Sequence, residues 1–412
     1  MKLITCFRGG KITLLAGRVF DGQTLLGEQH IEIIISGGTI ISVHPPAGES
    51  PTPQIQADEI LDLREYTVLP GLVDCHVHLA LDGRDFSRSL EMWRHKEQLQ
   101  ERIEADLART MGAGVAAVRD GGDREAVGMM ARELAARGVA PGPLVRVAGP
   151  ALRKKGGYGS FLGPGLKGES PGKAVEDLAR LGVDQIKVLV SGVVSFKTYG
   201  LVGDLQFSQG ELAEIVSAAK AVGLRVMAHA SSDQAVRLAL RAGVDSLEHG
   251  YFVSQESLEE LARAGIPWVP TLAPVACQVQ GALIDRYSPE KREVINKTLF
   301  RQQEMVKRAA DLGVRIGVGS DAGAVGVPHG LGLLAEMLCL EEAGLTRTEI
   351  LRAATAGGAA ILGLDREIGS VRPGRRACLI AVRGNPLEDL RLLGDPGYMI
   401  LPPAGQANPG RV

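Results

Sequence analysis

Between residues 67 and 364, short apolar segments with strand character alternate with segments that carry helix signals. Two of the helix signals, at residues 208–211 and 346–349, have the spacing of a capping box and precede apolar helical runs. We expect eight strands, at residues 68–75, 115–119, 144–148, 185–190, 225–229, 246–249, 268–271 and 315–320. Strands that alternate with helices form parallel sheets, and eight such units are typical of a (β/α)8 TIM barrel, an α/β fold.

The two ends of the chain have a different pattern. Residues 1–66 contain short alternating strands between glycine turns, such as residues 31–35, and the same pattern returns at residues 377–382. We therefore expect residues 1–66 and 365–412 to form one small composite domain, a β-sandwich, beside a barrel of residues 67–364.

Composition and charge exclude several classes of protein. The net charge of −2 leaves no basic stripe for a phosphate backbone, so we expect no nucleic-acid partner. The five cysteines are odd in number and lack C-x-x-C spacing, which favours reduced thiols in a cytoplasm. Because the first residues lack a long apolar core and no segment approaches membrane-spanning length, we expect a cytoplasmic protein with no membrane partner. The sequence leaves both a monomer and a homo-oligomer open.

Histidines gather at the ends of the expected strands. His76 and His78 are one residue apart in the first strand, so both side chains point to the same face. His229 and His249 close the fifth and sixth strands, and Asp321 follows the eighth. Functional groups in barrel enzymes lie at the C-terminal ends of the strands, and imidazole with carboxylate suits zinc. The pattern therefore predicts a metal site at the mouth of the barrel.

Lys187 lies inside the fourth expected strand, between Ile186 and Val188. An ammonium buried there is costly unless it is paired or modified, and burial makes a lysine amine more nucleophilic. Such an amine can take up carbon dioxide as a carbamate, whose two oxygens can bridge two cations. The alternative is a lysine whose ammonium reaches an acidic loop at the barrel mouth. The nearby histidines favour the metal role.

Several short motifs stand in a fixed order along the chain. They are GRVFDG (17–22), PGLVDCHVH (70–78), VRDGG (118–122), EHG (248–250), GSDAG (319–323), AAT (353–355) and GNPL (384–387). On these motifs the chain resembles the amidohydrolase superfamily of metal-dependent hydrolases, in particular its prolidase and imidazolonepropionase-like branch. The resemblance covers nearly the whole chain.

The resemblance implies a centre of two divalent metal ions, with zinc as the expected metal. One ion would be held by His76, His78 and Asp321 and the other by His229 and His249, with N6-carboxylated Lys187 as the bridge. Asp321 would be the catalytic proton shuttle, which takes a proton as the metal-bridging hydroxide attacks a carbonyl and passes it to the departing amine. Asp74 shares the face of the histidines but lies deeper, so we expect a hydrogen-bond acceptor there rather than a ligand.

The implied reaction is hydrolysis of an amide or peptide C–N bond in a small polar molecule, such as an N-acyl amino acid or dipeptide. Candidate substrate-binding residues are Tyr158 and Arg153 in the glycine-rich loop 149–165, Tyr251 beyond the sixth strand and His329 beyond the eighth. Related enzymes often have histidine at the position of Tyr158, so dipeptidase specificity does not follow from the resemblance. Arg153 suits a substrate carboxylate but also an ordinary solvated loop, and His329 also suits a helix entry.

The same residues also favour or disfavour other functions. Deaminases of the superfamily that act on cyclic amidines or nucleobases commonly use one metal, lack the bridging lysine and place a glutamate three residues after the fifth-strand histidine. Here that position is Ser232, and Lys187 is present, so deamination is disfavoured. Hydrolysis of lactones or organophosphates stays open because it uses the same two-metal centre. A non-catalytic assembly protein is disfavoured because every expected ligand is present.

Overall fold

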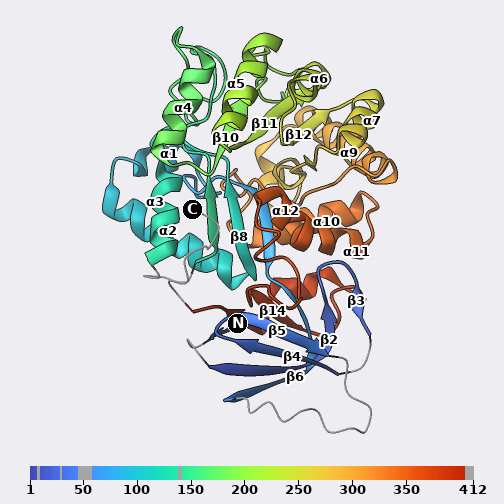
Figure 1. Ribbon diagram of the computed structural model, residues 1–412. Helices are drawn as coiled ribbons and strands as arrows, with labels where there is room; N and C mark the ends of the chain where they lie inside the picture. The colour runs from blue at the N-terminus through green and yellow to red at the C-terminus, as the bar shows by residue number, and fades with distance from the viewer. Residues whose placement is uncertain (7–9, 28–29, 45–57, 138–141, 404–412) are drawn as a thin grey trace.

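Parallel strands with helices between them make up the middle of the chain (Figure 1). The computed structural model describes residues 1–6, 10–27, 30–44, 58–137 and 142–403. One parallel sheet contains β7 (Leu72–Val77), β8 (Val115–Asp120) and β9 (Leu144–Val147). A second contains β10 (Gln185–Leu189), β11 (Arg225–Ser232), β12 (Ser246–Phe252) and β13 (Trp268–Val269). Seven of the eight predicted strand positions are thus strands in the structure.

Helices surround these strands on the outside (Figure 1). They are α1 (Phe86–Met92), α2 (Lys96–Gly112), α3 (Val127–Arg137), α4 (Pro171–Leu181), α5 (Gln209–Ala221), α6 (Asp233–Ala242), α7 (Gln255–Ala264), α8 (Ala273–Ala276), α9 (Pro289–Asp311), α10 (Leu331–Glu342), α11 (Arg347–Arg352) and α12 (Gly358–Leu362). Short 3-10 or π turns lie at Gly281–Arg286, Ala353–Gly357 and Leu390–Gly394. The predicted capping boxes of α5 and α11 are both present.

The eighth predicted strand, residues 315–320, is irregular, with a single bridge between Ile316 and Trp268. Its backbone still pairs on both sides, because Trp268 N donates to Arg315 O (2.9 Å) and Cys75 N donates to Val318 O (2.8 Å). The prediction of a regular strand was therefore wrong, although the segment occupies the expected place between β13 and β7. The two parallel sheets are linked between β9 and β10 by Leu152, which follows β9. Its N donates to Lys187 O in β10 (2.8 Å).

Strands from both ends of the chain share another sheet, which lies beside the barrel-like part (Figure 1). Its order is β1-β15-β14-β6-β2-β4-β5, with β3 paired to β2. These strands are β1 (Lys2–Thr5), β2 (Lys11–Phe20), β3 (Leu25–Leu26), β4 (Ile31–Ser36), β5 (Thr39–His44), β6 (Glu59–Pro70), β14 (Leu379–Arg383) and β15 (Tyr398–Leu401). Hydrogen bonds join these eight strands into one sheet. The sequence had instead predicted a β-sandwich, which consists of two packed sheets. The predicted strand 68–75 is divided at Gly71: its first part belongs to β6 and its second part is β7.

None of the helices in the described ranges combines the length and the hydropathy that crossing a membrane requires.

Candidate metal centre

The six predicted metal ligands come together at one end of the parallel strands. They are His76 in β7, His78 just after it, Lys187 in β10, His229 in β11, His249 in β12 and Asp321 after the irregular segment. The ring centroids of His76 and His249 are 4.9 Å apart, and those of His229 and His249 are 4.5 Å apart. Lys187 Nζ lies 3.4 Å from His76 Nε2, inside the cluster rather than in solvent. Side chains separated by up to 245 residues along the chain therefore share one small volume.

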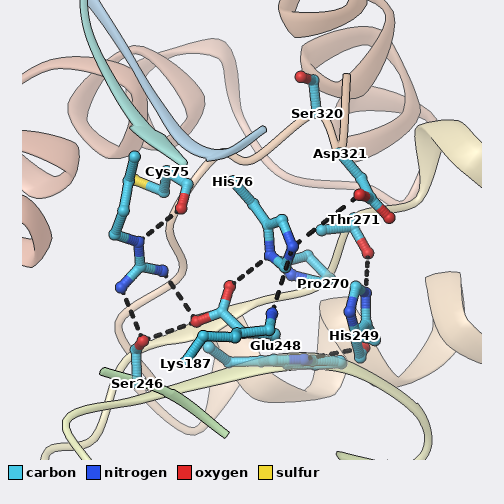
Figure 2. Close-up of polar contacts among 12 residues, drawn as sticks. Cys75, His76, Lys187, Ser246, Glu248, His249, Pro270, Thr271, Ser320 and Asp321 are labelled. Carbon is cyan, nitrogen blue, oxygen red and sulfur yellow. Dashed lines mark hydrogen bonds and ion pairs between the residues drawn. The ribbon is translucent and has the colours of Figure 1, made fainter. Parts of the chain in front are cut away.

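Asp321 lies against three of the histidines. Its Oδ1 is 3.9 Å from His76 Nε2 (Figure 2). The same oxygen is 3.4 Å from His78 Nε2. One potential ligand atom from each of His76, His249 and Asp321 lies within 4.8 Å of the others. The resemblance implied a different metal ion for His249 than for His76 and Asp321, whereas the geometry places His249 close to both.

Hydrogen bonds fix the orientation of the imidazole rings. His76 Nδ1 lies 2.7 Å from Glu248 Oε2, and His249 Nδ1 lies 2.7 Å from Thr271 Oγ1 (Figure 2). His78 Nδ1 lies 3.2 Å from the carbonyl oxygen of Gly122. With Nδ1 used in these contacts, the Nε2 atoms are available to a shared ligand, and such outer contacts typically orient metal-binding histidines. The donor set therefore fits divalent cations.

Burial sets the charges of the same groups. It lowers the pKa of His76 and His249 well below the usual value of a histidine. Burial also lowers the pKa of His78 and His229 to about 3, and the positive charge of Lys187 adds to this effect. Neutral imidazole is the form that binds metals. Burial also lowers the pKa of Lys187, which favours a neutral amine.

The backbone at the site adopts an unusual conformation. His249, Thr271 and Asp321 have φ angles of 67°, 53° and 53°, a region that residues other than glycine rarely occupy. The carbonyl oxygen of His249 accepts hydrogen bonds from Trp268 Nε1 (3.1 Å) and Gln302 Nε2 (3.0 Å). These bonds hold His249 in a conformation that costs free energy, and such strain is concentrated at functional sites.

The buried ion pair behind His76, between Arg119 and Glu248, was not predicted from the sequence. Arg119 Nη2 donates to Glu248 Oε1 (2.8 Å), and Ser246 Oγ donates to the same oxygen (2.6 Å). The sequence does contain a sign of a buried charge, because Glu248 is a charged residue inside an expected strand, directly before His249. The expectation for Asp74 agrees with the structure: its carboxylate accepts from Ser320 N (2.9 Å) and Ser320 Oγ (2.5 Å).

A cavity of about 330 Å³ opens onto the cluster. It is lined by His78, Leu81, Phe86, Tyr158, Phe161, Leu162, Lys187, Val193, His229, His249, Tyr251, Asp321, Gly323, Ala324 and Val325. Both predicted tyrosines, Tyr158 and Tyr251, are in this lining. Arg153 and His329 are not: Arg153 donates to the carbonyl oxygen of Tyr158 (2.8 Å), and His329 Nε2 lies 2.8 Å from the carbonyl oxygen of Leu81. Direct contact of these two with a substrate stays a prediction.

Known proteins resemble this chain over most of its length. It is 27% identical over 363 residues to an ochratoxinase of Aspergillus niger, covering 80% of this chain and 72% of that protein. It is 26% identical over 382 residues to an imidazolonepropionase of Sphingopyxis alaskensis, covering 85% and 86% of the two chains. A solved Xaa-Pro dipeptidase with bound methionine superposes with a TM-score of 0.80 at 28% identity, covering 95% and 98%.

These neighbours and the family match imply a TIM barrel with a small additional domain. They also indicate a metal-dependent hydrolase that acts on C–N bonds of small molecules, in the prolidase and imidazolonepropionase-like branch. Residues 67–403 match the amidohydrolase family, and the chain belongs to it.

Proposed function

We propose that the chain hydrolyses an amide C–N bond with a centre of two divalent metal ions, most simply zinc, bridged by N6-carboxylated Lys187. The observation that carries the proposal is the convergence of Lys187, Asp321 and three neutral histidines on one cavity, with His76 beside Lys187 behind its wall. His76, His78 and Asp321 would hold one ion, and His229 and His249 the other. When bound, the ions would activate water and polarise a carbonyl group.

Asp321 is suited to move the proton in this reaction. Burial raises the pKa of Asp321 above the usual range of an aspartate, so its carboxylate can accept a proton near neutral pH. It lies on the cavity wall, where it can pass that proton to the nitrogen of the departing amine. The cavity encloses the reacting bond with Tyr158 and Tyr251 on its walls, where each hydroxyl can position a polar atom of the substrate.

The proposal extends to the architecture and the setting of the enzyme. We propose that the seven strands and segment 315–320 close into a (β/α)8 barrel of residues 67–364, which the backbone bonds of Leu152 and Arg315 support. Residues 1–66 and 365–412 would form the small domain. The five cysteines are free, which supports a reducing compartment such as the cytoplasm.

The metal content of the purified protein tests the proposal. We expect about two divalent ions per chain by elemental analysis, with loss of amide hydrolysis after chelation and recovery on adding zinc. One ion per chain would point instead to deaminase-like chemistry, and absence of any ion from every metal-supplemented preparation would contradict an enzyme of this type.

Replacement of Lys187 tests the bridge. Lys187→Ala should lose both metal and activity, because the anionic bridge between the cations is gone, and small carboxylates such as acetate should restore part of each. A fully metallated and active Lys187→Ala protein would contradict the bridge.

Replacement of Asp321 separates proton transfer from metal binding. Asp321→Asn should retain metal but lose most of its turnover, about 100-fold or more, because an amide cannot accept the proton. Elemental analysis and the rate of amine release give the two readouts, and a wild-type rate would remove Asp321 as the shuttle.

A further inference from the structure

The ionisable side chains on the cavity wall are already committed to the candidate metal centre. Apart from the two tyrosines, they are His78, Lys187, His229, His249 and Asp321. The remaining side chains on the wall are apolar. Two basic residues of the loop 149–165 have other partners: the guanidinium of Arg153 donates to the carbonyl oxygens of Tyr158 and Gly157, and Lys154 forms an ion pair with Glu211. The third, Lys155, is exposed and is not part of the cavity wall. The described wall therefore offers no cation of its own to a charged substrate group.

Aromatic rings form a continuous strip from the mouth of the cavity to the histidines. Phe86, which is 40% exposed at the mouth, packs edge-on against Phe161 with ring centroids 5.0 Å apart. Phe161 packs against Tyr158 at 6.2 Å, and Tyr158 packs against His229 at 5.6 Å. On another side Tyr251 stacks on His249, with an angle of 3° between the rings. A flat apolar group that enters along this strip meets ring faces and edges at each step.

We propose that this enzyme takes a neutral amide that carries an aromatic ring next to the scissile bond, and that it disfavours substrates with a free carboxylate on either side of that bond. The inference rests on the proposed function, because it treats the six clustered residues as metal ligands. It narrows the small polar substrate that the sequence predicted to a class that is apolar outside its amide. The cavity volume of about 330 Å³ lies near the lower end of the range for small-molecule sites, so one ring and one amide are the expected contents.

Desolvation explains the preference. A carboxylate placed along the strip would lose water and gain no charged partner, and burial of an unpaired charge is strongly unfavourable. A benzene ring loses no hydrogen bonds on entering and gains contacts with Phe161 and Tyr158.

Three matched amides test the inference on the full-length, zinc-loaded protein. N-isobutylbenzamide is neutral and aromatic, N-benzoylglycine replaces its isopropyl group with a carboxylate of similar shape, and N-isobutylacetamide lacks the ring. We measure amine release for each compound, and binding by the shift in melting temperature. N-isobutylbenzamide should give the largest shift, and its kcat/KM should exceed those of the other two by about tenfold or more.

The two proposals fail in different ways in this experiment. Equal or better binding of N-benzoylglycine or N-isobutylacetamide, or binding of none of the three, would overturn the inference about substrate class. Binding in the expected order with no amine released from any compound would overturn the proposed hydrolysis and leave the recognition chemistry standing.

An added cation at the rim provides an independent test. Val193 lines the cavity and is 44% exposed, so Val193→Arg adds a charge without burying it. The variant should raise the kcat/KM for N-benzoylglycine by up to about fivefold, the factor expected for a partly exposed ion pair. Val222→Arg is the matched control, because Val222 is 42% exposed and lies outside the cavity wall. An equal change in both variants, or no change in Val193→Arg, would contradict the inference that carboxylate substrates are disfavoured because the wall lacks a cation.

Discussion

His76 is the residue on which the contacts of the candidate site converge. Its Nε2 faces Lys187 and Asp321, its Nδ1 faces Glu248, and its backbone oxygen accepts from Asp321 N at 2.7 Å. Glu248 in turn compensates the buried charge of Arg119. The orientation of one candidate metal ligand is thus tied to a buried ion pair, so a change in that pair should affect metal binding and stability together.

Replacement of Glu248 tests this dependence. Glu248→Gln leaves the buried guanidinium of Arg119 without its counter-charge, which should lower the free energy of unfolding by about 3 kcal/mol or more. Loss of the carboxylate that orients His76 should also weaken metal affinity by about 10- to 100-fold. Chemical denaturation and metal titration measure the two effects.

An exposed acid provides the matched control for this prediction. Asp62 pairs with Arg64, but their side chains are 52% and 55% exposed. Asp62→Asn should leave the unfolding midpoint and the metal affinity unchanged, because solvent screens that pair. If Glu248→Gln behaves like Asp62→Asn, the buried pair does not support the site.

At the scale of elements, the irregular segment 315–320 carries Asp321 to the histidines. It passes so close to its neighbours that a Cβ atom at Gly319 would lie 2.4 Å from Val269 Cγ1 and 2.9 Å from His76 Cβ. The two glycines of this segment, Gly317 and Gly319, allow the close approach. The alternation of strands and helices predicted the position of this segment, but its irregular form depends on packing against residues far away in the sequence.

Gly319→Ala should displace this segment from β7. We expect a lower unfolding midpoint and weaker metal binding, because Asp321 is two residues away and its N donates to His76 O. Gly210→Ala in α5 is the control, since a Cβ there meets nothing within 4 Å and alanine favours a helix. A Gly319→Ala protein with unchanged stability and metal affinity would show that the close contact does not hold Asp321 in place.

The sequence predicted those features that depend on alternation along one strand or on strand ends. The common direction of His76 and His78 follows from the period of a strand, and the end positions of His229 and His249 follow from the alternation of strands and helices. The pairing of Glu248 with Arg119 could not be predicted in the same way, because it joins two strands through side chains whose contact depends on packing.

At the scale of the whole molecule, the two ends of the chain are joined through β6. This strand pairs with β14 up to Pro70, and β7 begins at Leu72 with the segment that carries His76. The sequence predicted one strand over residues 68–75. In the structure, residues up to Pro70 pair with β14, which lies over 300 residues away along the chain, and β7 begins only after Gly71. Since local sequence does not encode such distant pairing, the boundary between the sheets is less predictable than the ligands.

One contribution to stability should fall as the pH rises, because an acid is buried between α10 and α8. Glu336 is fully buried, and its Oε2 accepts a hydrogen bond from Ala273 N (2.7 Å). Burial raises the pKa of Glu336 to about 8 from the usual 4.5. Between these two pH values the folded protein keeps a proton that the unfolded chain releases, so the free energy of unfolding contributed by Glu336 falls by about 1.4 kcal/mol per pH unit.

Glu336→Gln removes this titration, so the free energy of unfolding of the wild type should fall relative to that of Glu336→Gln as the pH rises from 5 to 8. Denaturation midpoints are compared on metal-free protein, because a cation near Asp321 would lower the pKa of Glu336. Glu342→Gln, an exposed change in the same helix, should follow the wild-type profile. Parallel profiles for Glu336→Gln and the wild type would mean that Glu336 is ionised in the folded protein, and that the interior near α8 stabilises its charge.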